Sequence, residues 1–215
     1  MLAGEDRAAL GELAPVLRRA AGLDPRSLAR LRLDGASATV LVRLPFGVLV
    51  SRTVDAPDRD EPLDVTLRAA DVVSWLDADP ATAVVPAARD VEWRAGLPPR
   101  SGWKRLEKLP DDVIRGLVRT GALALKESAA RAGLPGAQPR AEVADALLDS
   151  VVLTATDDAG TSAELTLRAV SALTRMGFLP RGGHAYVDVA GRWVRLVGGY
   201  GTVYLERPGQ ALGIV

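Results

Sequence analysis

The fold is decided most clearly by residues 184–206, which read HAYVDVAGRWVRLVGGYGTVYLE. Valine and aromatic residues alternate there with polar ones, and this pattern is typical of strands that bury one face. Ala190-Gly191 and the glycine-rich run at 198–201 interrupt the pattern at the points where tight turns would connect the strands. The segment therefore predicts a three-stranded antiparallel meander.

The sequence before this meander predicts a long helix. Pro110 suits a first helical position, and Asp111 and Asp112 would complement the helix dipole. Apolar residues then recur at helical spacing to about Ala132, and they are Ile114, Leu117, Val118, Gly121, Leu125 and Ala129. We expect this stripe to pack on the core.

Two further helices are expected between the long helix and the meander. One would cover residues 139–154, although 151–156 taken alone also fits a strand. The other would begin with a capping box formed by Thr161 and Glu164 and would end at Gly177 in a left-handed cap.

The first half of the chain predicts a helix, a hairpin, and a strand followed by a second helix. Residues 5–21 have leucines at helical spacing, but Pro15 lacks an amide hydrogen and should kink or split that helix. Residues 37–54 read SATVLVRLPFGVLVSRTV and fit two strands joined by a turn at 44–47. An acidic loop then leads to the strand and helix over 63–76.

Prolines and glycines interrupt residues 78–109, so this segment is expected to connect two regions without regular structure. The predicted division is an N-terminal α+β region, 1–97, and a C-terminal helical region with a small antiparallel sheet, 98–215. The two regions could also form one compact unit. The expected fold class is α+β.

Two hexapeptides in the chain are similar, DVTLRA at 64–69 and ELTLRA at 164–169. An old duplication would explain them. Composition explains them better, because Ala, Leu and Arg are so abundant here that short matches arise by chance.

Composition is that of a folded protein inside the cell. The 215 residues are 48% apolar and carry 27 basic and 27 acidic side chains, so we expect a packed core and no net charge. Cysteine is absent, which excludes disulfides, thiolate nucleophiles and cysteine-bound metals. The start resembles no signal peptide and no run is long enough to span a membrane, so a soluble, cytoplasmic protein is expected. The 24 arginines against 3 lysines are typical of GC-rich, actinobacteria-like composition.

The patterns that would support catalysis or metal binding are incomplete. His184 is the only histidine, and no serine in a G-x-S-x-G turn accompanies it. Ser101 and Lys104 match S-x-x-K, but the chain has no asparagine to complete the accompanying motif. The acidic loop at 55–64 lacks the spacing of a calcium loop, and the glycines at 198–201 open no helix. We therefore expect no catalytic residue, no metal and no cofactor.

Two tryptophans in the connecting segment suggest a binding surface. With the cationic side chains beside them they would line a groove for a protein partner, and the residues are Trp93, Arg94, Arg100, Trp103, Lys104 and Arg105. The sequence thus favours a non-catalytic protein that binds another protein or a ligand. It leaves the oligomeric state open.

Two other functions are alternatives. Three helices followed by a hairpin resemble a winged helix in outline, with Arg192 and Arg195 on the wing. However, residues 141–164 hold six acidic and no basic side chains, which would repel phosphates and makes nucleic acid the less favoured partner. The other alternative is an enzyme that works through Asp, Glu and Arg alone.

Overall fold

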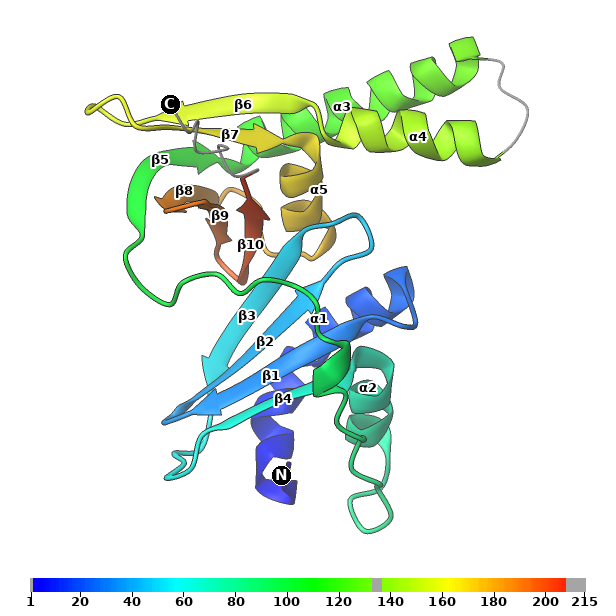
Figure 1. The fold of residues 1–215 in the computed structure, drawn as a ribbon, viewed down its shortest axis with the longest axis vertical. Coiled ribbons are helices and arrows are strands. Elements are labelled where there is room, and N and C mark those ends of the chain that lie inside the picture. Colours follow the sequence, from blue (N-terminus) through cyan, green and yellow to red (C-terminus); the bar gives the residue numbers. More distant parts are fainter. Residues whose placement is uncertain (1, 133–136, 208–215) are drawn as a thin grey trace, which may run out of the picture. The chain divides into compact units, whose positions relative to one another are not determined.

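The computed structural model describes residues 2–132 and 137–207, and the chain forms two compact units, residues 1–97 and 98–215. Each unit combines antiparallel β-strands with helices (Figure 1). The α+β class expected from the sequence is therefore confirmed.

Unit 1 (residues 1–97) has a sheet in the order β4-β1-β2-β3, with every neighbouring pair antiparallel. Helices α1 and α2 pack on each other and on one face of this sheet (Figure 1). The elements are η1 (Gly4–Asp6), α1 (Arg7–Leu23), β1 (Leu28–Asp34), β2 (Ser37–Arg43), β3 (Leu49–Asp55), β4 (Leu63–Arg68), α2 (Ala69–Asp77) and η2 (Asp90–Glu92).

Strand alternation decides which side chains of unit 1 are buried. In β1, Ala29, Leu31 and Leu33 are buried, while Arg30 and Arg32 are only half-buried. Successive side chains of a strand point to opposite faces, so the two arginines lie on the face away from this apolar core. The arginines of the outer face therefore follow from the same pattern that builds the core.

Two expectations for unit 1 are confirmed and two need correction. The hairpin over 37–54 forms as β2 and β3, with Gly47 at φ +85° in its turn. The strand and helix over 63–76 form as β4 and α2. Strand β1 was not predicted, although its apolar residues alternate. Pro15 does not split the helix, because α1 continues through it.

Pro15 is tolerated inside α1 because of where it lies. It is exposed, and so is Gly11, whose carbonyl loses the amide donor that a residue other than proline would supply. Water can hydrogen-bond that carbonyl, so the lost helix bond leaves no buried polar group. The buried face of α1, with Leu10, Leu13 and Leu17, is undisturbed.

Unit 2 (residues 98–215) has a sheet in the order β10-β9-β8-β5 and a separate hairpin of β6 and β7. Helix α5 packs on β9 and β10, and α3 packs on β5, α4 and α5. The elements are β5 (Lys104–Pro110), α3 (Asp111–Ala132), α4 (Ala137–Leu148), β6 (Val151–Thr156), β7 (Ser162–Thr166), α5 (Leu167–Arg175), β8 (His184–Ala190), β9 (Trp193–Gly198) and β10 (Gly201–Glu206).

The meander is confirmed in part, because β8, β9 and β10 pair as expected but β5 adds a further strand beside β8. Residues 104–109 were expected to be irregular and Pro110 to be the first helical residue, but Pro110 is the last residue of β5. The register of β5 against β8 shifts between Arg105 and Glu107, and the two buried side chains, Leu106 and Leu109, are three residues apart. This bulge hides the two-residue period of a strand.

The hairpin β6–β7 corrects both helix predictions for residues 139–176. Helix α4 ends at Leu148, and residues 151–156 form the strand that was the alternative. Thr161 caps no helix, because Asp157 accepts its amide at 2.8 Å and Gly160 takes φ +79° in the turn between the strands. Pairing of β6 with β7 outweighs the local helix signal.

The end of α5 is as predicted. Gly177 takes φ +68°, and its amide donates to the carbonyl of Thr174 at 3.0 Å. The amide of Phe178 donates to the carbonyl of Leu173 at 3.0 Å, which completes the Schellman arrangement. The Phe178 side chain is buried in the core of unit 2.

The two similar hexapeptides occupy corresponding places in the two units. Each lies where a strand passes into a helix, β4 into α2 and β7 into α5. The first helical residue then donates its amide to the carbonyl of the residue before the paired strand, Ala69 to Ser27 at 2.9 Å and Leu167 to Ser150 at 3.0 Å. Helix α2 begins at the sixth residue of its hexapeptide and α5 at the fourth residue of the other. The two hexapeptides therefore lie at the same kind of junction, but the helices do not begin at equivalent residues.

Candidate functional site

The sheet of unit 2 carries a row of charged and aromatic side chains on one face. The register pairs Arg105 with Asp188, Asp188 with Arg195, and Arg195 with Tyr204, so these four residues align across β5, β8, β9 and β10. The neighbouring row, with Val187, Leu196 and Val203, is buried on the opposite face. We call the outer side chains the aromatic–arginine face, and its residues are Trp103, Arg105, His184, Tyr186, Asp188, Arg195 and Tyr204.

Asp188 organises the charges of this face. Its side chain is only 3% exposed, and the carboxylate accepts from Arg105 Nε at 3.0 Å and from Arg195 Nε at 2.9 Å. Burying a carboxylate is unfavourable unless it is paired and hydrogen-bonded, and the two arginines fulfil that condition. One carboxylate faces two guanidinium groups, so this part of the face keeps one positive charge.

Aromatic rings hold both arginines in place. The Arg195 guanidinium lies 4.2 Å from the centroid of the Trp103 ring, and Arg105 lies 3.6 Å from that of Tyr186. The Trp103 indole donates to the carbonyl of Pro99 at 2.9 Å, and Tyr204 lies beside it at a centroid distance of 5.9 Å. These stacked cations and rings stabilise one another.

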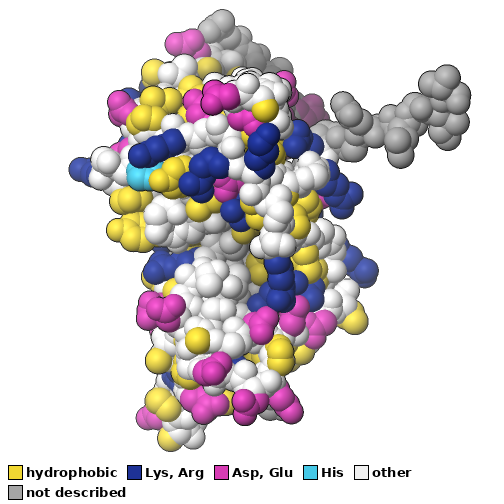
Figure 2. Space-filling view, turned by 90° about the vertical axis from the view of Figure 1, so that its left-hand side faces the viewer, with side chains coloured by type: hydrophobic (Ala, Val, Ile, Leu, Met, Phe, Trp, Pro, Cys, Tyr) yellow, Lys and Arg dark blue, Asp and Glu magenta, His cyan; other side chains and the backbone are white. Residues whose placement is uncertain are grey.

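His184 closes one end of the aromatic–arginine face. Its Nε2 lies 2.7 Å from the Tyr186 hydroxyl, and the two rings meet edge to face. In Figure 2 the cyan histidine lies among basic and hydrophobic side chains. The imidazole of His184 is therefore held in place by Tyr186, through one hydrogen bond and one ring contact.

The residues predicted to form one binding groove are divided between the two units. Trp103 and Arg105 lie on the aromatic–arginine face of unit 2, whereas Lys104 pairs with Asp157 at 2.6 Å in the β6–β7 turn. Arg100 is exposed in the loop before β5. Trp93 and Arg94 belong to unit 1, and the Trp93 indole donates to the carbonyl of Ala95 at 2.8 Å.

Three residues of the aromatic–arginine face, Tyr186, Asp188 and Tyr204, were missed from the sequence, and Arg195 was considered only as a wing residue for nucleic acid. All four come from the three strands of the meander, and each is an outward position of an alternating pattern. That alternation was visible in the sequence. The pairing register, which sets these positions side by side with Arg105, was not.

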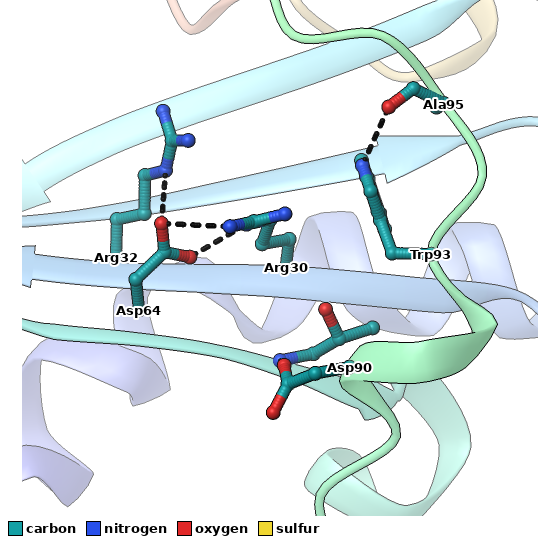
Figure 3. A network of polar contacts seen from close by, with 7 residues as sticks. Arg30, Arg32, Asp64, Asp90, Trp93 and Ala95 are labelled. Carbon is teal, nitrogen blue, oxygen red and sulfur yellow. Dashed lines mark hydrogen bonds and ion pairs between the residues drawn. The ribbon is translucent and has the colours of Figure 1, made fainter.

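Unit 1 has its own polar network on the outer face of its sheet (Figure 3). Asp64 of β4 accepts from Arg30 Nε at 2.6 Å and from Arg32 Nε at 3.1 Å. Trp93 lies over Arg30, with 5.9 Å between guanidinium and ring centroid. Asp90 accepts the amide of Thr66 at 2.6 Å, which ties η2 to β4.

The charges of this network alter the acidity of its members. Partial burial would raise the pKa of Asp64, but the hydrogen bonds and positive charges of Arg30 and Arg32 prevail and lower it. The hydrogen bond to Asp64 in turn raises the pKa of Arg30. Both shifts favour the charged forms, as an ion pair requires.

Unit 1 is expected to lose stability as the pH falls below about 4. A carboxylate whose pKa is lower in the folded protein stabilises it fully above the unfolded pKa and loses that effect as the pH falls through the folded value. The Asp64 side chain is 36% exposed, so the contribution should stay below about 1 kcal/mol. Urea unfolding at several pH values should show a shallower acid decline for Asp64→Asn. Identical profiles for both proteins would contradict this.

Some features fall outside the aromatic–arginine face. Within residues 2–132 and 137–207, no group of three or more His, Asp or Glu side chains is arranged to hold a metal ion. Ser101 is exposed beside Gly102, and the acidic loop contributes Arg59 to an ion pair with Asp6. No helix in the described part of the chain is long and apolar enough to cross a membrane.

Two family models match the sequence, one for each half. Residues 98–210 match a family described as a domain of unknown function (DUF8185), and residues 1–95 match a second domain of unknown function (DUF8010). No curated protein has a significantly similar sequence.

The fold resembles that of bacterial sliding clamps. The DNA polymerase III subunit beta of Pseudomonas aeruginosa matches with a TM-score of 0.60 at 12% identity, over 97% of this chain and 65% of that one. The DNA polymerase sliding clamp of Caulobacter crescentus gives 0.59 at 12% identity, over 97% and 65%. The beta clamp of H. pylori gives 0.57 at 9%, over 96% and 64%. The chain thus spans less than two thirds of these proteins, and at such identities the likeness is one of fold alone.

Proposed function

This chain belongs to the family described as domain of unknown function DUF8185, and from that premise we propose that it is a non-catalytic, protein-binding module with a clamp-like fold. The aromatic–arginine face of unit 2 is the proposed binding surface. The observation that carries the proposal is the stack of Trp103 on Arg195 beside Tyr204. A few residues dominate the binding energy of protein interfaces, and tryptophan, tyrosine and arginine are enriched among them.

The aromatic–arginine face is held in place before any partner arrives. The Trp103 indole donates a hydrogen bond to a backbone carbonyl, and the buried Asp188 carboxylate accepts hydrogen bonds from both Arg105 and Arg195. Ordering a long side chain on binding costs roughly 0.5–1.5 kcal/mol, and much of that cost is met here by the fold. A partner can therefore use these side chains with little loss of conformational entropy.

The charges of the face favour an acidic partner segment. Asp188 balances one of the two arginines, and Lys108 is exposed opposite Tyr186 on the neighbouring strand. Carboxylates of a partner would find planar guanidinium groups with donors left over, since each guanidinium has five N–H groups. We propose a protein segment that carries acidic and aromatic or aliphatic side chains.

The alternative of a nucleic-acid partner is less well supported. A winged helix would need two helices where β6 and β7 lie, and both predicted wing arginines are in ion pairs, Arg192 with Glu206 at 2.6 Å and Arg195 with Asp188 at 2.8 Å. Helices α1 and α2 together carry three basic and three acidic side chains, so their net charge is zero. The basic residues are Arg7, Arg18 and Arg19, and the acidic residues are Glu12, Asp71 and Asp77. Phosphate binding requires an excess of cations.

The substitution Trp103→Ala is expected to weaken partner binding strongly. The full chain serves as bait, and the partner that it captures is then titrated against purified variants by calorimetry. Loss of a central tryptophan typically costs at least about 2 kcal/mol, which is roughly a thirtyfold weaker Kd. Tyr200→Ala is the matched control, because Tyr200 is 53% exposed in the β9–β10 turn, outside the proposed surface.

The result that supports the proposal is a partner that Tyr200→Ala retains and Trp103→Ala loses, with unchanged circular dichroism. Retention by Trp103→Ala would remove the aromatic–arginine face as the binding surface. Tight binding of mixed-sequence duplex DNA at about 50 mM salt, weakening steeply with added salt, would instead favour the nucleic-acid alternative.

A further inference from the structure

Helix α3 leaves most of its apolar stripe incompletely covered. Among the predicted stripe residues, Ile114 is fully buried, but Leu117 and Leu125 are only half-buried. Val113 and Leu123 are 41% and 62% exposed. The expectation that the stripe packs on the core therefore holds for its first turn, and apolar surface is left along the rest of the described helix.

A groove of about 480 Å³ lies beside this helix within unit 2. Its walls come from α3, α4, β6 and α5, and they include Val113, Leu117, Gly121, Leu147, Val152 and Leu167. This volume is within the range of pockets that bind ligands or side chains, roughly 300–1,000 Å³. The lining is mostly apolar, so the hydrophobic effect would drive binding.

Gly121, which lines the groove, lets α5 lie close to α3. A Cβ atom built there would lie 2.4 Å from Leu167 Cδ1, so a larger residue would collide with α5. Leu167 can therefore pack against the bare backbone of α3. Gly116, five residues earlier on α3, also lines the groove.

The length of the groove fits a partner helix. Its wall on α3 extends from Val113 to Ala124, and eleven steps along a helix cover about 16 Å, or three turns. A helix that lies in such a groove inserts apolar residues spaced three or four apart. Three turns supply enough of these residues to fill it.

Charge at the rim identifies the kind of helix. Asp145 and Asp149 precede and follow the lining residue Leu147 in the chain, their side chains are 66% and 65% exposed, and both pair with Arg168, which follows the lining residue Leu167. On α3, exposed Arg119 is offset by exposed Asp112. Among these five described side chains, three carboxylates stand against two cations, a net negative charge that complements lysine and arginine.

We propose that this groove binds an amphipathic helix of a partner protein, with an apolar stripe about three turns long flanked by lysine or arginine. The site differs from the aromatic–arginine face both in place and in chemistry, because that face is positive and built on the sheet. The inference therefore does not depend on the function proposed above.

The test uses a model peptide of about 18 residues, with leucines on one helical face and lysines on the other. A second peptide replaces every lysine with glutamate. Fluorescence anisotropy with the full chain should show binding of the lysine peptide and at least tenfold weaker binding of the glutamate peptide. Equal affinity for both would overturn the inference.

Two substitutions locate the binding. Ala124→Arg places a cation in the groove and should weaken the lysine peptide at least tenfold, and Thr120→Trp, at an exposed lining position, should do the same by filling the space. Val84→Arg is the matched control, because Val84 is 85% exposed in unit 1. Unchanged affinity in Thr120→Trp would overturn the inference even if Ala124→Arg failed to fold.

Discussion

Gly198→Ala is expected to destabilise the protein by at least about 3 kcal/mol, beyond the usual cost of an overpacked core. A Cβ atom at this position would lie 2.4 Å from the carbonyl oxygen of Phe178 and 3.0 Å from its carbonyl carbon. Both are backbone atoms. That carbonyl also accepts the amide of Tyr200 at 3.1 Å, so it cannot move without loss of a turn hydrogen bond.

The loss should appear in unit 2. Phe178 is buried beneath Gly201 as well, where an added Cβ would lie 2.6 Å from its ring. An added side chain would therefore push the β9–β10 turn away from the end of α5. Urea unfolding followed by tryptophan fluorescence measures the effect, since Trp103 and Trp193 report on this unit.

Gly116→Ala is the control for this substitution. Gly116 is in α3, and a Cβ there would meet only the end of Arg119 at 3.9 Å. Alanine in place of a helical glycine should stabilise the protein by about 0.5–1 kcal/mol. If Gly198→Ala were as stable as the natural protein, the close packing of β9 on Phe178 would be refuted.

Arg59→Met is expected to destabilise unit 1 by about 3–5 kcal/mol, the cost of leaving one member of a buried ion pair uncompensated. Asp6 is 1% exposed and accepts from Arg59 Nη1 at 2.6 Å and from the amide of Ala3 at 2.7 Å. Methionine would keep the apolar stem of Arg59 but leave the carboxylate without its cation. The pair also ties the acidic loop to the start of α1.

Arg18→Met is the matched control, because it breaks an exposed ion pair. The side chains of Arg18 and Asp77 are 50% and 55% exposed, and such pairs contribute about 0–1 kcal/mol. The double variant Asp6→Leu with Arg59→Met should recover most of the lost stability, because no charge is then buried. If Arg59→Met unfolded at the same urea concentration as Arg18→Met, the Asp6 carboxylate would not depend on its cation.

The fold by itself does not indicate a function for this chain, whereas the side chains of the aromatic–arginine face support the proposal of protein binding. At 9–12% identity, the likeness to sliding clamps is one of fold alone. Function depends on sites placed on a fold. For that reason the proposal of protein binding rests on Trp103 and Arg195, and the clamp fold supplies only the frame that holds them.

Several elements could be predicted because their signals are local. The hairpin β2–β3 and the end of α5 depend on turn residues and side-chain periods within a few positions, such as Gly47 and Gly177. Strand β1 was missed although its pattern is also local, because leucine, alanine and arginine are good helix formers and lower the strand signal. The hairpin β6–β7 was misread because Thr161 and Glu164 imitate a helix start.

By itself, the sequence determined the α+β class, most of the strands and helices, and the absence of cysteine chemistry, because composition and short-range periodicity depend only on neighbouring residues. Only the tertiary structure decided how β5 pairs with β8 and which side chains meet on the outer face. Arg105 reaches Asp188 across 83 positions of the chain. Such contacts are set by strand register and by a bulge, and neither leaves a mark in the residues that surround either partner.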